Sequence, residues 1–154
     1  MTFNERRHLA DRRRAPRGGR RATDRPGRHP QILIADSYDG ARIPCAKYLD
    51  RLGFGVLEVG DGQRALAHID ARLPDVIVIE NGLPDAPVAQ VARRLCGSQV
   101  VPLIVTTSDL DVVEETVTGL PHVAVLEKPF SMAMMVEEIR RLLRAQPVPM
   151  AEPI

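Results

Sequence analysis

Cysteine, aromatic side chains and long apolar segments are all scarce in this chain of 154 residues. The two cysteines, Cys45 and Cys96, are too few for a disulfide framework and lack C-x-x-C spacing, so we expect reduced, structural thiols. No stretch approaches the ~20 uncharged apolar residues that a membrane span needs. No apolar segment follows the N-terminal arginines, which argues against a signal peptide. These absences predict a cytoplasmic protein with no membrane partner.

The overall composition is that of a single globular domain. Apolar residues make up 44% of the chain and charged residues 27%, both close to globular averages. These values exclude collagen-like, coiled-coil and wholly disordered chains. The length agrees with a prior of roughly 150 residues per domain.

The net charge of +1 hides a strong asymmetry along the chain. Residues 1–30 hold ten arginines against three acidic residues, a net charge of +7. The remaining residues hold 11 basic and 17 acidic side chains, a net charge of −6. Residues 10–31 also contain almost nothing apolar, so burial cannot offset their ordering entropy. We therefore expect residues 1–30 to form a disordered, Arg-rich arm.

Three roles for this arm stay open at this point. The first is contact with nucleic acid or an acidic protein surface. The second is a solvated tail that keeps the protein soluble, favoured because no base-stacking aromatics are interleaved in residues 10–31. The third is a contact with the acidic part of the same chain, covering the pocket at Asp36 and Glu80.

From residue 31 the chain alternates between short apolar runs and amphipathic segments. The pattern predicts strands at 32–35, 55–59, 75–79, 100–106 and 123–126, and helices at 41–52, 63–71, 86–95, 109–117 and 131–145. Strict alternation with solidly apolar strands predicts an α/β, doubly wound, five-stranded parallel sheet with helices on both faces. We expect one domain over residues 31–145, strand order 2-1-3-4-5, and a flexible tail over 146–154.

Helix ends carry their own signals. Asp61 and Ser131 are predicted N-caps, and Ser108 is expected to open a capping box. Gly53 is expected to end the first helix, and Pro44 to fall in that helix's first turn.

Polar side chains follow four of the predicted strands, where open α/β sheets place their sites. They are Asp36 after the first strand, Glu80 after the third, Thr107 after the fourth and Lys128 after the fifth. Carboxylate oxygens suit a hard cation such as Mg²⁺, and the lysine and threonine suit a phosphoryl group.

Residues 31–145 resemble the receiver domain of two-component response regulators along essentially its full length. The order and spacing of five segments carry this resemblance, namely ILIADS at 32–37, LGFGVLEVGDGQRAL at 52–66, PDVIVIENGLP at 74–84, VPLIVTTS at 101–108 and EKPF at 127–130. The resemblance implies an acid pair that binds Mg²⁺ and an aspartate that accepts a phosphoryl group from a histidine kinase. It also implies a hydroxyl and an aromatic residue that relay the change.

The match at the acidic positions is partial. Asp36 matches the first acid of the family's pair, but Ser37 stands in place of the second. Glu80 occupies the phosphoacceptor position in place of aspartate, and Gly82 is placed to offer a backbone carbonyl to the metal. With one carboxylate lost, we expect a Mg²⁺ site formed by Asp36, Glu80 and Gly82 to be weak or absent.

The relay positions are also only partly kept. Thr107 matches the relay hydroxyl and Lys128 the lysine that contacts the phosphoryl group, whereas Val125 replaces the aromatic switch residue. Glu80 carries one methylene more than aspartate, so its carboxylate reaches roughly 1.5 Å further, towards Lys128 and Thr107. In-line transfer needs nucleophile and metal placed together, so this site is expected to perform it poorly.

The sequence therefore predicts a stand-alone, non-enzymatic receiver-like protein that acts by protein contact, with Glu80 either as a mimic of the phosphorylated state or as an inert ion-pair partner. The expected partner face comprises helix 109–117, strand 123–126 and helix 131–145. The alternatives are a phosphorylatable regulator served by a histidine kinase, and nucleic-acid binding through residues 1–30. A flavodoxin-like enzyme is disfavoured because the acidic loop after the first strand would repel a flavin phosphate.

Overall fold

A computed structural model describes residues 29–95, 101–117 and 122–145 of the chain. The predicted arm, apart from its last two residues, and the predicted tail lie outside these residues. The expectations about them therefore stay predictions, as do the domain boundaries.

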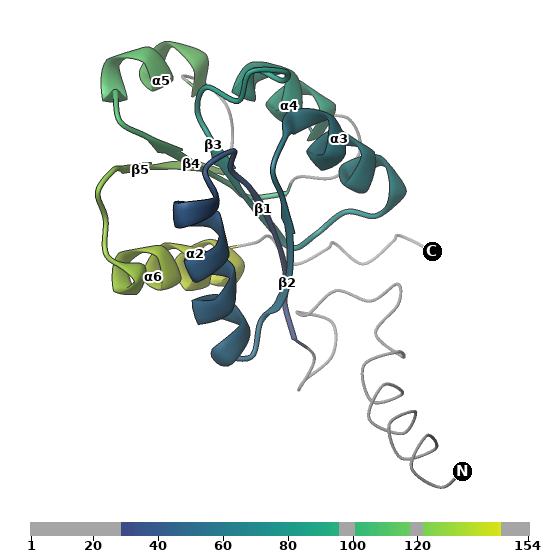
Figure 1. Ribbon diagram of the computed structural model, residues 1–154, viewed down its shortest axis with the longest axis vertical. Coiled ribbons are helices and arrows are strands. Elements are labelled where there is room, and N and C mark those ends of the chain that lie inside the picture. Colours follow the sequence, from purple (N-terminus) through teal and green to yellow (C-terminus); the bar gives the residue numbers. More distant parts are fainter. Residues whose placement is uncertain (1–28, 96–100, 118–121, 146–154) are drawn as a thin grey trace, which may run out of the picture.

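Five parallel strands form one sheet in the order β2-β1-β3-β4-β5, as predicted (Figure 1). The strands are β1 (Gln31–Ala35), β2 (Gly55–Val59), β3 (Val76–Glu80), β4 (Leu103–Thr107) and β5 (Val123–Glu127). The central strands β1, β3 and β4 are buried almost throughout, whereas the edge strands β2 and β5 are half exposed. Burial on both faces explains why the central strands read as solid apolar runs.

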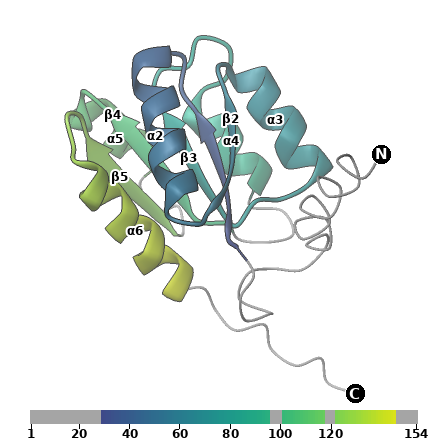
Figure 2. The same cartoon turned by 60° about the horizontal axis from the view of Figure 1, so that its bottom comes forward.

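Helices cover both faces of the sheet, so the doubly wound prediction is confirmed. The helices are α2 (Asp39–Arg51), α3 (Gly62–Ala71), α4 (Val88–Leu95), α5 (Leu110–Val117) and α6 (Met132–Arg144). Helices α2 and α6 lie on one side of the sheet and α3, α4 and α5 on the other (Figures 1 and 2).

Alternate residues of each central strand feed two separate apolar cores. Leu33 and Ile77 join the core beneath α3, α4 and α5, whereas their neighbours Ile32 and Val76 join the core beneath α2 and α6. This alternation follows from the two-residue repeat of a strand. The two cores hold the strands in register, and with them the loops that follow their carboxyl ends.

Three of the predicted helix ends are confirmed. The Asp61 carboxylate accepts a hydrogen bond from the first turn of α3. The Ser131 hydroxyl accepts one from the first turn of α6. Gly53 follows α2 with a φ of +99°, and the Gly53 and Phe54 amides donate to Asp50 and Leu49. This pair of bonds is a Schellman ending, which places Phe54 against the core below Leu49.

The predictions for Pro44 and Ser108 are wrong. Helix α2 begins at Asp39, so Pro44 lies in its second turn and leaves the Gly40 carbonyl without its helical donor. Helix α5 is capped by Asp109, whose carboxylate accepts from the Asp111 amide, and not by Ser108. The Asp109 amide itself is turned inward to Thr107, which moves the helix start one residue on.

Among the residues that the structure describes, no helix is long and apolar enough to cross a membrane.

Candidate functional site

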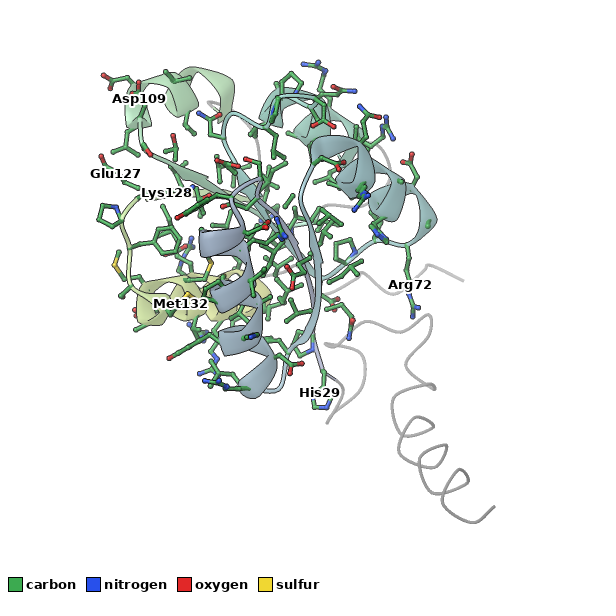
Figure 3. The ribbon with its side chains drawn as sticks, viewed as in Figure 1. His29, Arg72, Asp109, Glu127, Lys128 and Met132 are labelled. Atoms are coloured by element: carbon green, nitrogen blue, oxygen red, sulfur yellow. The ribbon has the colours of Figure 1, made fainter. Side chains whose placement is uncertain are left out.

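The four predicted site residues all lie at the carboxyl ends of the strands. Asp36 follows β1, Glu80 and Thr107 end β3 and β4, and Lys128 follows β5. Lys128 and Asp109 lie at this end of the sheet and His29 lies at the opposite end (Figure 3). Asp36, Glu80 and Lys128 meet directly: the Lys128 amine is 3.5 Å from the Asp36 carboxylate and 3.8 Å from that of Glu80.

Ser37 holds the Glu80 carboxylate in place. The Ser37 amide and hydroxyl both donate to Glu80 Oε1, each at 2.9 Å. The other oxygen, Oε2, faces Lys128. The Glu80 side chain is only 19% exposed, so the two donors and the amine take the place of water around it.

Burial and these donors pull the pKa of Glu80 in opposite directions. Burial alone raises it, but the two hydrogen bonds from Ser37 and the charge of Lys128 outweigh burial and leave the pKa below its ordinary value of 4.5. Glu80 is therefore an anion in the neutral range.

Asp36 is displaced in the other direction. Burial raises the pKa of Asp36 above its ordinary value of 3.8, and the nearby Glu80 carboxylate adds to the rise. The Tyr38 amide, which donates to Asp36 Oδ1 at 2.8 Å, and Lys128 oppose it without cancelling it. Two carboxylates beside one amine thus hold their protons with unequal strength.

The Thr107 hydroxyl contacts the loop after β4 and not Glu80. It accepts from the Asp109 amide at 2.9 Å and donates to the Asp109 carbonyl at 3.1 Å. The Asn81 side-chain amide adds a longer contact to it at 3.4 Å. Thr107 also ties the site together through its backbone carbonyl, which accepts from the Lys128 amide at 2.7 Å.

The remaining predicted residues lie around this cluster without a polar contact to it. Gly82 makes a turn after β3 with a φ of +99°. Val125, on β5 beside Val105 of β4, is partly buried and packs against the core beneath α3, α4 and α5.

Arg42 supports the loop that carries Asp36 and Ser37, a role that the sequence did not indicate. Its guanidinium donates to the Asp36 carbonyl at 2.9 Å and to the Glu58 carboxylate on β2 at 2.8 Å. It also pairs with Asp39, one turn earlier on α2, at 2.8 Å. An arginine one helical turn after an acidic residue could have indicated this role, but many exposed helices contain such a pair.

A five-stranded sheet in this order, with carboxylates after β1 and β3 and a lysine after β5, defines the receiver class of signalling domains. The chain belongs to the response regulator receiver domain family, whose model matches residues 32–140. Receiver domains act in two-component signalling, and the predicted resemblance is confirmed.

Curated relatives are longer proteins. The chain is 37% identical over 116 residues to the transcriptional regulatory protein TrcR of Mycobacterium tuberculosis, covering 74% of this chain and 45% of TrcR. It is 28% identical over 112 residues to PdtaR, a transcriptional regulatory protein of the same organism, covering 71% of this chain and 54% of PdtaR. The chain thus spans about half the length of the curated relatives it matches.

Solved structures show the same fold. The receiver domain of the Francisella response regulator 1452 matches with a TM-score of 0.67 at 22% identity, covering 75% of this chain and 98% of that one. A response regulator receiver protein from Sinorhizobium medicae matches with a TM-score of 0.65 at 25% identity, covering 76% and 96%.

Receiver domains typically bind Mg²⁺ at this site, and the two carboxylates here are fewer than the family's three. Each of the four carboxylate oxygens of Asp36 and Glu80 already faces a donor from Ser37, Tyr38 or Lys128. Within the described ranges, no group of three or more His, Cys, Asp or Glu side chains could hold a metal ion. Lys128 also offsets part of the charge of the two carboxylates, so Asp36, Glu80 and the Gly82 carbonyl would hold a divalent cation more weakly than a complete acid set.

Proposed function

We propose that this chain takes part in two-component signalling as a pseudo-receiver, acting by protein contact and not by accepting a phosphoryl group. The observation that carries the proposal is the occupied carboxylate of Glu80, which accepts twice from Ser37 and faces Lys128.

Phosphoryl transfer needs a free oxygen placed in line with the donor, together with a cation that neutralises the transferring group. In this site both oxygens of Glu80 face donors, and the cation that faces them is the lysine of the chain itself. The hydrogen bonds that lower the pKa of Glu80 also weaken it as a nucleophile.

The contacts of Thr107 favour an inert ion-pair site over a mimic of the phosphorylated state. A mimic would draw the relay hydroxyl towards the charge at position 80, whereas Thr107 is bonded to Asp109. The valine at position 125 also lacks the bulk that gives an aromatic switch two distinct positions. We therefore propose one dominant conformation, with partner contact through α5, β5 and α6.

Exposed apolar side chains on two of these elements support a contact role. Leu110 and Val112 on α5 are 37% and 52% exposed, and Met134 on α6 is 50% exposed. Such side chains are used in protein interfaces more often than charged ones.

The test is labelling by acetyl phosphate and Mg²⁺, read by intact-protein mass spectrometry. We expect no stable adduct on the wild-type chain. The double variant S37D/E80D restores both acids of the family pattern and is expected to gain a Mg²⁺-dependent adduct.

The variant E80Q is the control for labelling at other residues. A wild-type adduct that needs Mg²⁺ and disappears in E80Q would overturn the proposal and support the phosphorylatable alternative, with a histidine kinase as the natural donor.

A further inference from the structure

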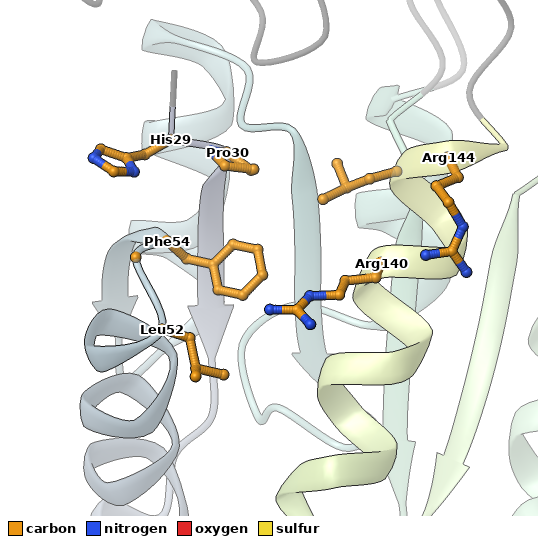
Figure 4. Close-up of a pocket in the computed structure, with 8 residues that line it drawn as sticks. His29, Pro30, Leu52, Phe54, Arg140 and Arg144 are labelled. Carbon is orange, nitrogen blue, oxygen red and sulfur yellow. The ribbon is translucent and has the colours of Figure 1, made fainter. Parts of the chain in front are cut away.

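A pocket of about 420 Å³ lies at the end of the sheet opposite the site described above. It opens where β1 and β2 begin and α6 ends, and its walls come from three parts of the chain (Figure 4). The lining residues are His29, Pro30, Leu52, Gly53, Phe54, Arg140, Leu143 and Arg144. Its volume falls within the range of ~300–1,000 Å³ that is usual for small-ligand sites.

One side of this pocket is apolar and the other is basic. Leu52 and the Phe54 ring face the guanidinium of Arg140 across the opening, and Arg144 lies one turn further along α6 (Figure 4). The Arg140 guanidinium carbon is 5.9 Å from the centre of the Phe54 ring, a cation–π contact. This contact holds a planar cation at the edge of an apolar wall.

The two arginines have no acidic partner among the residues that the structure describes. Arg141, next to Arg140 on α6, is paired with Glu138 at 2.7 Å. Neither Arg140 nor Arg144 has a described carboxylate within the 4.0 Å of an ion pair. Two guanidinium groups with no acidic partner in the described part of the chain, beside an apolar wall, favour an anion that also carries an apolar ring.

We propose that this pocket binds a nucleotide. The base packs between Leu52, Leu143 and the planar guanidinium of Arg140, and the phosphate lies against Arg140 and Arg144. Arginine suits both parts, because its guanidinium stacks on planar rings and donates in pairs to phosphate. The pocket shares no residue with the Glu80 site, so the proposal does not depend on the function proposed above.

The test is an NMR titration of the full chain with AMP, followed through the backbone amides. We expect shifts at Gly53, Phe54 and Leu143 and none at Ser37. R140A and R144A should each weaken AMP binding about tenfold, the loss expected for one charged hydrogen-bonding partner. R141A removes the same charge from the same helix outside the pocket, and should leave the affinity within about twofold.

Three further measurements separate a nucleotide site from a general anion site. Leu52 is 43% exposed, so L52E should fold, and its carboxylate should abolish AMP binding. Adenosine and inorganic phosphate, added separately, should bind more weakly than AMP. A short single-stranded oligonucleotide that displaces AMP and binds more tightly would identify the natural source as nucleic acid.

The proposal is overturned if millimolar AMP shifts none of the pocket amides, or if R141A weakens binding as much as R140A. It is also overturned if inorganic phosphate alone binds as well as AMP, since the apolar wall would then contribute nothing to the affinity.

Discussion

At the scale of single residues, Ser37 and Glu80 form a matched pair. An acid at position 37 would place another negative charge beside Glu80, in addition to Asp36, whereas serine supplies a hydroxyl that donates to Glu80. The sequence indicated the two substitutions separately: Ser37 as the loss of a metal ligand, and Glu80 as a displaced carboxylate. Their direct contact depends on the path of the loop after β1, which no local pattern encodes.

Removing the Ser37 hydroxyl should weaken the site without dismantling it, because the backbone amide still donates to Glu80. We expect S37A to cost about 0.5–1 kcal/mol at neutral pH, a discounted value for a charged hydrogen bond that solvent partly screens. The lowered pKa of Glu80 stabilises the fold above pH 4.5, and this part is lost as pH falls through the folded-state pKa. Urea unfolding should therefore show a larger S37A effect at pH 7 than at pH 3.

The matched control is S108A, which removes an exposed hydroxyl at the same edge of the sheet. Equal losses in the two variants, or a loss in S37A that does not change with pH, would contradict the role given to Ser37.

Asp36 should show the opposite pH dependence, since its pKa is raised in the folded state. The fold then binds the proton more tightly than the unfolded chain, so this residue costs stability as pH rises above 3.8. D36N lacks that cost. We expect the melting temperature of D36N minus that of the wild type to be larger at pH 7 than at pH 3. Thermal denaturation at both pH values measures this difference. A difference that is the same at both would rule out a buried, shifted carboxyl at this position.

At the scale of elements, prolines set two of the boundaries that the sequence misplaced. The helix expected to begin at Ala86 begins at Val88, because the residue before a proline avoids the helical region and Pro87 follows it directly. The strand expected from Val100 begins at Leu103, just past Pro102, which has no amide to donate. The type and order of every element were predictable from periodicity, but these ends needed the restrictions on the residues that flank each proline.

The loop after β3 is joined to α3 by a contact that the sequence did not reveal. The Asp85 carboxylate accepts from the Gly62 and Gln63 amides at 2.7 and 3.0 Å, so a residue after β3 caps a helix that precedes it. These hydrogen bonds lower the pKa of Asp85. Ala86 packs so close to Gly62 that a Cβ at position 62 would collide with it.

Gly62→Ala should therefore separate α3 from the loop that follows β3 and carries Asp85. We expect a loss of about 1–3 kcal/mol in urea unfolding, the usual cost of overpacking, together with changed NMR shifts at Asp85 and Asn81. Gly40→Ala is the contrasting variant, because the nearest atoms to its Cβ belong to the ring end of Tyr38, a side chain that is 66% exposed and can turn away. That helical position should gain stability or stay neutral. Similar losses at the two glycines would contradict the close contact with Ala86.

At the scale of the whole molecule, the acidic site and the basic pocket occupy opposite ends of one sheet. Asp36 and Glu80 lie at the carboxyl ends of the strands, whereas Arg140 and Arg144 of α6 lie beside the amino ends of β1 and β2. The described part of the chain begins at His29, which lines the pocket, so the Arg-rich residues 1–28 join the domain at its basic end. The −6 charge of residues 31–154 is thus not spread evenly, a feature that the charge count alone concealed.

This polarity leads to a prediction for the Arg-rich arm. If residues 1–30 bind duplex DNA through about six phosphate contacts, the logarithm of the affinity should fall with the logarithm of salt with a slope of about −5. Replacing Arg12, Arg13 and Arg14 by glutamine in the full chain should make that slope shallower by about 3. Fluorescence anisotropy of a labelled duplex at several salt concentrations measures both slopes.

The control is R64Q, which removes an exposed arginine that is paired with Asp61 on the domain and should leave the slope unchanged. A flat salt dependence in the wild-type chain, or an equal change in R64Q, would rule out phosphate binding by the arm, because contacts with phosphate must release counterions wherever they form.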